Sequence, residues 1–243
     1  MFYPFAEILL QINFCIYLLG FATALSRNFN FNIILVGLIY MAPLVPWGLI
    51  PGTEGRFLVV SFMNTIFGIL ELAIFVITVR PADITFDTTF MKQLWGHTLP
   101  IALALIGLSY FARMQVVPVG HLELALILVL FIGGSVFRVA AVYQIGTEAF
   151  KFDIAFRDRQ TLKNDQLYGW VRHPSYLAMM VVILAYAVNT HSWLAGTLGT
   201  LTAWFGFQYR IHHEEKALAQ KFGAEYEKFR SRTGMWLPRF PCK

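Results

Sequence analysis

The feature that most constrains this chain is a series of long, mostly apolar runs. Each is close to the length of about 20 residues that an α-helix needs to cross a bilayer. Because lipid offers the backbone no hydrogen-bonding partners, such runs are stable as helices. Only 14% of the 243 residues are charged, against about 25% in a soluble domain. We therefore expect an all-α, polytopic membrane helical bundle, with long spans at roughly residues 5–25, 31–50, 57–79, 99–119 and 122–143.

Two shorter apolar runs follow, at 176–188 and 193–207. They predict a C-terminal helical hairpin or two tilted helices, which brings the bundle to about seven transmembrane helices. If all seven cross, the segments on one side carry 16 of the 19 Lys and Arg residues. Cytosolic loops are enriched in these residues, so we expect the C-terminus in the cytosol and the N-terminus outside. The first run lacks the basic flank of a signal peptide and is expected to be retained.

Polar residues are unevenly distributed along the chain. They are sparse before residue 138 and dense after residue 145. We therefore interpret residues 1–125 as membrane-spanning scaffold helices and residues 126–243 as the functional core.

An apolar stripe marks the end of the chain. Leu218, Phe222, Tyr226 and Phe229 recur at spacings of four, four and three residues, with Lys and Glu between them. This pattern predicts a cytosolic amphipathic tail helix over about residues 214–232 that lies against the membrane face.

Arg138 is a charged residue inside an apolar run. An arginine in that position is costly in lipid and usually faces a cavity or a partner. Glu71, in the middle of the third run, is the candidate partner, and we predict an ion pair between the two. The alternative is that the long side chain of Arg138 snorkels to the nearby interface.

Arg172, His173 and Pro174 connect a polar stretch to the next apolar run. Pro174 disfavours a helical conformation at His173 and suits the first turn of the helix that follows. Arg172 and His173 would then lie at a helix N-terminus, whose unpaired N–H groups and dipole favour an anionic ligand. The alternative is an interfacial anchor with a basic flank.

Arg210 and Glu214 are four residues apart and share one face of a helix. An ion pair at the membrane edge is the simplest role for them. The neighbouring His212 and His213 point about 100° apart on a helix, which is a poor arrangement for two ligands of one metal ion. We therefore predict no metal site.

Taken in order, these residues resemble the isoprenylcysteine carboxyl methyltransferase family, part of a wider group of membrane methyltransferases that includes the phospholipid methyltransferases. The resemblance covers about residues 130–240, and residues 1–125 add only hydrophobicity. The matching residues are Arg138, Val139, Ala140, Ala141, Gly146, Phe150, Tyr168 to Tyr176, Arg210, Glu214, Glu215, Leu218, Phe222, Gly223, Glu225, Tyr226 and Pro238.

The resemblance implies transfer of a methyl group from S-adenosyl-L-methionine to the C-terminal carboxylate of a prenylated cysteine. It also implies that residues 126–243 form a membrane-embedded methyltransferase core with a cytosol-facing cofactor pocket. Relatives usually have His and Val where this chain has Gln160 and Lys163. The cofactor-binding residues it implies are Gln160, Thr161, Leu162, Lys163, Tyr168, His173, Pro174, Ser175, Tyr176, Glu214 and Glu215.

The resemblance implies that Arg210 contacts the acceptor and that Arg138 lies at the membrane-embedded end of the site. We expect Arg210 and Arg138 to be the catalytic residues that position the acceptor carboxylate, and Arg172 to bind substrate with them. The planar fork of arginine holds a carboxylate through two hydrogen bonds. Because the acceptor carboxylate is already ionised near neutral pH, no general base is needed. The expected partners are the lipid bilayer and a prenylated cysteine or another lipophilic acceptor, with no nucleic acid and no metal.

Other functions stay open at this point. A methyltransferase acting on a phospholipid amine or a small thiol would need a base such as His173 or His212. A membrane NADPH-dependent reductase of similar architecture need not carry a glycine-rich nucleotide motif. A non-enzymatic scaffold would leave the ordered polar residues unexplained. We expect a multi-pass protein of the endoplasmic reticulum membrane in a eukaryote, or of the inner membrane in a prokaryote, with the site facing the cytosol.

Overall fold

A computed structural model of the protein describes residues 3–27, 34, 37–38, 55–78, 88–146 and 161–239, and the regular secondary structure in these ranges is helical. An isolated bridge between Val171 and Gly234 is the one strand-like pairing in these ranges. The all-α prediction is confirmed for these residues. The helices are α1 (Tyr3–Arg27), α4 (Arg56–Thr78), α5 (Thr88–Gln93), the π-helical turn η3 (Leu94–Thr98), α6 (Leu99–Met114), α7 (His121–Ile145), α8 (Gln166–Trp170), α9 (Pro174–Asn189), α10 (Trp193–Phe222) and α11 (Ala224–Arg232).

Several helices have the length and hydropathy of membrane spans, so the chain is an integral membrane protein. In the described residues the qualifying segments are Glu7–Ser26, Arg56–Phe75, Met91–Met114 and His121–Ile145. They correspond to four of the five long runs; the run at 31–50 lies almost wholly outside the described residues. Pro174–Asn189 is a shorter apolar helix. The count of about seven spans stays a prediction.

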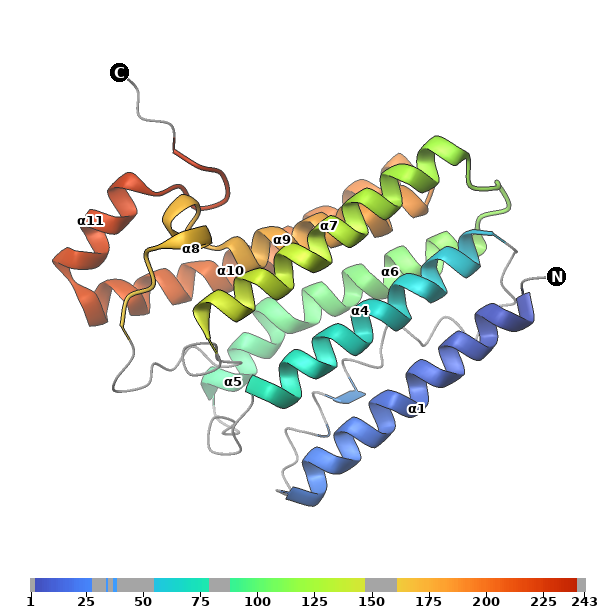
Figure 1. Cartoon of the computed structure of the whole chain (residues 1–243), viewed down its shortest axis with the longest axis horizontal. Coiled ribbons are helices and arrows are strands. Elements are labelled where there is room, and N and C mark those ends of the chain that lie inside the picture. Colours follow the sequence, from blue (N-terminus) through green and yellow to red (C-terminus); the bar gives the residue numbers. More distant parts are fainter. Residues whose placement is uncertain are drawn as a thin grey trace.

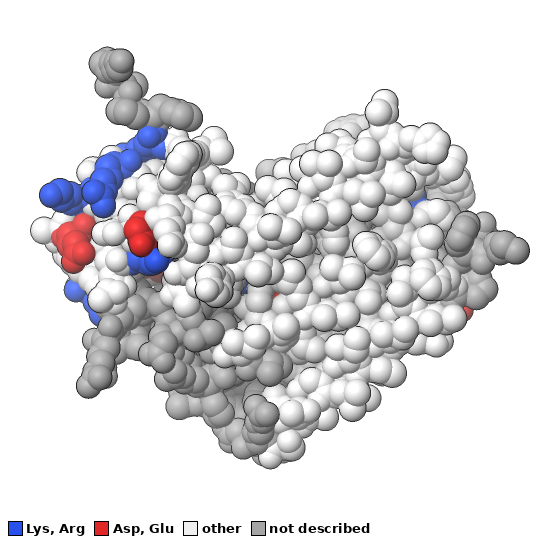
Figure 2. Space-filling model, viewed as in Figure 1, with Lys and Arg blue, Asp and Glu red and all other residues white. Residues whose placement is uncertain are grey.

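Helix α9 lies at the centre of the bundle and packs against α7, α10, α6 and α4. Figure 1 shows α1 at one edge, beside α4, and α10 extending beyond the bundle toward α11. The charged side chains visible in Figure 2 gather mainly at the end where α11 lies. Most of the remaining surface in this view is uncharged. This face of the molecule therefore has an apolar body and a polar end.

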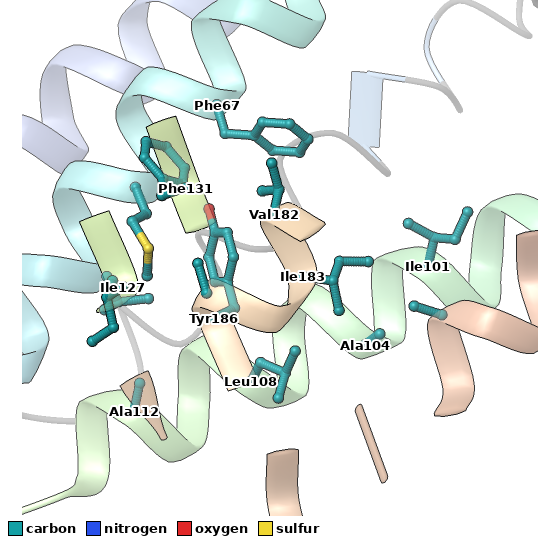
Figure 3. Close-up of a cluster of buried hydrophobic side chains, with 14 of the residues drawn as sticks. Phe67, Ile101, Ala104, Leu108, Ala112, Ile127, Phe131, Val182, Ile183 and Tyr186 are labelled. Carbon is teal, nitrogen blue, oxygen red and sulfur yellow. The ribbon is translucent and has the colours of Figure 1, made fainter. Parts of the chain in front are cut away.

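The core is built around side chains of α9. Figure 3 shows Val182, Ile183 and Tyr186 among apolar residues of the neighbouring helices, and all three are at most 1% exposed. Tyr186 donates a hydrogen bond from its hydroxyl to Asn64 Oδ1 of α4 at 2.9 Å. Because this buried hydroxyl has a partner, α9 is fixed against α4 by polarity as well as by packing. The remaining residues labelled in Figure 3 are Phe67, Ile101, Ala104, Leu108, Ala112, Ile127 and Phe131.

The predicted hairpin consists of α9 and α10, which pack against each other across a short turn. Helix α9 begins at Pro174, as expected from the fixed φ and missing N–H of proline. Ser192 caps α10, its Oγ accepting a hydrogen bond from the backbone N–H of Ala195 at 3.3 Å. Both ends of this turn therefore lie close to the positions predicted from the sequence.

The tail differs from the single helix predicted over 214–232. Helix α10 continues without a break through Phe222, because no glycine or proline interrupts it after the apolar part. Gly223 then adopts φ 51°, in the left-handed region that favours glycine, and ends α10 before α11 begins. Tyr226 and Phe229 are buried, in agreement with the predicted apolar stripe.

Candidate active site

Three buried arginines lie around the first turn of α9, and each is paired with one glutamate. The pairs are Arg138 with Glu71, Arg172 with Glu215, and Arg210 with Glu214. A buried charge without a partner costs several kcal/mol, so the pairing allows these arginines to lie at the end of an apolar bundle.

Arg138 joins α7 to α4 and to the start of α9. Its Nε and Nη2 donate to the two carboxylate oxygens of Glu71 at 2.8 and 3.0 Å, and its Nη1 donates to Ser175 Oγ. The predicted pair of Arg138 with Glu71 is therefore confirmed. Its bidentate geometry is the strongest form of an arginine–carboxylate contact. Arg138 is 5% exposed and Ser175 is 7% exposed.

Arg210 lies at the centre of a second group. Its Nε donates to Glu214 Oε1 at 2.7 Å, and its Nη1 donates to Gln93 Oε1 of α5 at 3.1 Å. Tyr176 donates its hydroxyl to the same Glu214 oxygen at 2.5 Å. Because Ser175 and Tyr176 are adjacent, the first turn of α9 links the Arg138 and Arg210 groups.

His173 lies between two carboxylates just before α9. Its Nε2 is 3.2 Å from Glu215 Oε1, and its Nδ1 is 3.8 Å from Glu214 Oε2. The imidazole also stacks on the ring of Tyr176, with centroids 5.8 Å apart. His173 thus contacts both glutamates of α10 from the start of α9.

Arg172 fastens the start of α9 to the segment that follows α11. Its Nε donates to Glu215 Oε1 at 2.7 Å, and its Nη1 donates to the carbonyl of Thr233. Its backbone N–H donates to Gly234 O at 2.8 Å. The side chain is 5% exposed. These contacts give Arg172 a structural role here, and its substrate role stays a prediction.

Glu215 and Tyr168 lie at the polar end, outside the candidate spans, and have shifted pKa values. Burial acts to raise the pKa of the Glu215 carboxyl, but the hydrogen bonds from His173 and Arg172 outweigh it and hold the pKa at about 2. Burial raises the pKa of the Tyr168 hydroxyl, which donates to Ala141 O at 3.2 Å. At neutral pH Glu215 is therefore an anion and Tyr168 a neutral donor.

The other predicted cofactor residues lie before α8. Thr161 is exposed, and Leu162 and Lys163 are half-buried. Lys163 Nζ is 2.8 Å from Asp165 Oδ1 in a surface ion pair. Gln160 lies outside the described residues.

Sequence reasoning missed the aromatic side of the site. Tyr176 packs on Phe207, with centroids 5.6 Å apart, and His97 of η3 packs on both rings at 6.1 and 6.0 Å. Trp236 contacts Phe207 from the segment after α11. Apolar periodicity marks such residues as core, and no local pattern joins positions so distant in sequence.

The adjacent histidines do not form a joint site. His213 Nδ1 lies 2.8 Å from Tyr209 O on its own helix, and His212 is exposed. In the part of the chain that the structure describes, no three His, Cys, Asp or Glu residues gather in a way that could hold a metal ion.

Comparison with known proteins finds sequence similarity over the C-terminal half of the chain. A sequence model of the isoprenylcysteine carboxyl methyltransferase family matches residues 125–220. The "Probable protein-S-isoprenylcysteine O-methyltransferase" of Oryza sativa subsp. indica is 31% identical over 153 residues, which cover 55% of this chain and 78% of that protein. This chain belongs to the isoprenylcysteine carboxyl methyltransferase family.

Other members of the isoprenylcysteine carboxyl methyltransferase family match over a shorter range. The Schizosaccharomyces pombe enzyme is 30% identical over 110 residues, or 44% of this chain and 46% of its own length. The Homo sapiens enzyme is 31% identical over 113 residues, or 46% and 39%. The match thus spans less than half of these two relatives. A solved structure of the eukaryotic intramembrane Ras methyltransferase covers 96% of this chain and 97% of its own, at 17% identity and a TM-score of 0.47.

The family match includes only part of the polar cluster. Arg138, Arg210 and the first turn of α9 lie within it, whereas Glu71 and Gln93 come from helices before it. This member of the isoprenylcysteine carboxyl methyltransferase family therefore completes the cluster with residues from its own N-terminal half.

Proposed function

We propose that this protein transfers a methyl group from S-adenosyl-L-methionine to the C-terminal carboxylate of a prenylated cysteine. The observation that carries the proposal is the buried Arg210 with the half-buried Glu214 and Tyr176 at the polar end of an apolar bundle. Family membership supports it, since the relatives are named for this reaction.

The residues at the start of α9 fit the cofactor. S-adenosyl-L-methionine carries a sulfonium cation, an ammonium group and a carboxylate. The Glu214 carboxylate beside the rings of Tyr176 and His173 suits the cationic groups. The first N–H groups of α9, a helix of 16 residues, suit the cofactor carboxylate. When bound, the cofactor supplies an electrophilic methyl group.

The acceptor needs positioning more than activation. A carboxylate is ionised at neutral pH, so no residue has to remove a proton. In this proposal Arg210 holds the carboxylate with its planar fork, while Glu214 fixes the guanidinium through Nε. Arg210 is buried, which helps to keep water away from the reacting atoms, and alignment lowers the barrier.

The membrane location follows from the substrate. A prenyl chain is soluble in the bilayer, whereas the cofactor is soluble in water. A site at the border of the apolar body and the polar end is accessible to the prenylated acceptor from the bilayer and to the cofactor from water. We place this end in the cytosol because Lys and Arg concentrate after residue 145. The membrane would be the endoplasmic reticulum in a eukaryote and the inner membrane in a prokaryote.

The test is an acceptor comparison with the full-length protein in detergent. Methyl-labelled cofactor is supplied with N-acetyl-farnesylcysteine in one reaction and with phosphatidylethanolamine in another. We expect label on the farnesylcysteine only. Label on the phospholipid alone would contradict the prenylcysteine assignment and keep the methyltransferase class.

Cofactor binding distinguishes a methyltransferase from a membrane reductase. Adenosylhomocysteine binding is measured by calorimetry, with NADPH in a parallel titration. We expect a saturable signal from adenosylhomocysteine. Binding of NADPH without adenosylhomocysteine would favour a reductase and refute the methyltransferase proposal.

A further inference from the structure

A π-helical turn brings a residue to the site from outside the family match. Turn η3 lies between α5 and α6 and is a single π-helical segment. Such turns often occur at functional sites. Gln93, the last residue of α5, is 7% exposed, and its Oε1 accepts the hydrogen bond from Arg210 Nη1. Arg210 is therefore held by Glu214 on its own helix and by Gln93 on a distant one.

Two glycines permit this approach of η3 to α10. A Cβ atom at Gly206 would lie 2.9 Å from His97 O, and one at Gly96 would lie 2.6 Å from atoms of the Tyr209 ring. Because neither Cβ exists, the two elements pack closely, and His97 Nδ1 donates to Gly206 O at 3.1 Å. The packing thereby fixes the place of Gln93 beside Arg210.

The neutrality of Gln93 matters for the charge of the cluster. Arg210 has a carboxylate partner in Glu214, and the other two buried arginines have one each. An amide oxygen accepts a hydrogen bond from guanidinium without adding negative charge. A glutamate at position 93 would set a second carboxylate against Arg210 and repel an anionic ligand.

We propose that Gln93 is a specificity-determining residue, which orients Arg210 while keeping the site receptive to a negatively charged acceptor. The inference rests on the proposed function and concerns its acceptor class. An amide at position 93 suits a carboxylate acceptor. A carboxylate at this position favours a neutral or cationic one.

The test uses two ligands that differ in charge at a single group. Binding of N-acetyl-farnesylcysteine and of its methyl ester is measured with the wild-type protein, Gln93→Glu and Gln93→Met. We expect Gln93→Glu to weaken binding of the free acid about tenfold or more, and to change the affinity for the ester and for adenosylhomocysteine by less than about twofold. Gln93→Met keeps the length but loses the acceptor oxygen, so it should weaken binding of the acid less.

Gln220→Glu is the matched control, since it adds the same charge at an exposed position of α10. It should leave the affinity for the acid at the wild-type value. Equal losses for acid and ester in Gln93→Glu, or no loss for the acid, would overturn the specificity role. If wild type binds neither the acid nor the ester, the proposed function itself fails, and this result is distinct from both of the others.

Discussion

At the scale of single residues, the buried arginines differ in how they are held. Arg138 gives two nitrogens to the carboxylate of Glu71, whereas Arg210 contacts Glu214 through Nε and the neutral Gln93 through Nη1. The first arrangement favours a positioning role for Arg138, acting on Ser175. The second places a neutral amide beside Arg210, which agrees with the proposed role of Arg210 in holding an anionic acceptor.

Substitution of Arg210 by lysine tests this assignment. Lysine keeps the charge but loses the planar fork, so we expect Arg210→Lys to lower methyl transfer about tenfold or more. The affinity for adenosylhomocysteine should stay near the wild-type value. Arg232→Lys, at an exposed position of α11, is the control and should retain full activity. Unchanged turnover in Arg210→Lys would remove Arg210 from the acceptor site.

Substitution of Glu71 tests the pair with Arg138. Glu71→Gln leaves a buried guanidinium without its carboxylate, so we expect a loss of about 3 kcal/mol in the free energy of unfolding. Thermal unfolding in detergent measures the change. Glu225→Gln, exposed on α11, should be neutral in the same assay. Equal stability of the two variants would refute a structural contribution from the pair.

At the scale of helices, the site depends on close packing between α10 and η3. The contact between Arg210 and Gln93 spans 117 positions in the sequence. Gly206 lets η3 approach α10 closely, and Gln93 lies directly before η3.

A methyl group at Gly206 should disturb this contact. In Gly206→Ala the new Cβ would meet His97 O at 2.9 Å, so η3 has to move. Because small displacements of a catalytic group are costly, we expect methyl transfer to fall about tenfold while the fold is kept. Gly133→Ala on α7, where a Cβ meets nothing within 4 Å, is the control. Equal activity of the two variants would show that η3 does not position the site.

The features that the sequence predicts are those that proline geometry, polarity or the cost of a buried charge determine. The start of α9 at Pro174, the turn into α10 and the pair of Arg138 with Glu71 follow from proline geometry, polarity and the cost of buried charge. The sequence did not predict a role for Gln93, because that role arises from packing between helices that are distant in the sequence. The unbroken α10 was also missed, since the shift from apolar to charged residues was interpreted as a boundary although a helix tolerates it.

At the scale of the whole molecule, the polar cluster and α11 lie at one end, and the turn between α9 and α10 lies at the other. Arg56 stabilises that second end: it is fully buried and donates to the Glu123 carboxylate at 2.6 Å and to the carbonyl of Asn189 at 3.1 Å. These contacts tie α4 to α7 and to the end of α9. The turn between α9 and α10 therefore lies at the opposite end of the molecule from the charged, exposed residues of α11 (Figure 1).

Cysteine labelling tests the orientation. Lys228→Cys on α11 is made in a variant whose Cys15 and Cys242 are replaced by serine. We expect a membrane-impermeant maleimide to label it in inside-out vesicles and to leave it unlabelled in right-side-out vesicles. His191→Cys, in the exposed turn between α9 and α10, should show the reverse. The same accessibility for both positions would contradict the proposed orientation.

The central claim is that the Arg210 group presents a carboxylate to the methyl donor. The most direct measurement is the alkali lability of the transferred methyl group, because a carboxyl methyl ester releases methanol in base while a methylated amine or thiol does not. We predict that the label transferred by the wild-type protein to N-acetyl-farnesylcysteine is released completely as volatile methanol. Label that stays on the product after alkali treatment would contradict the account.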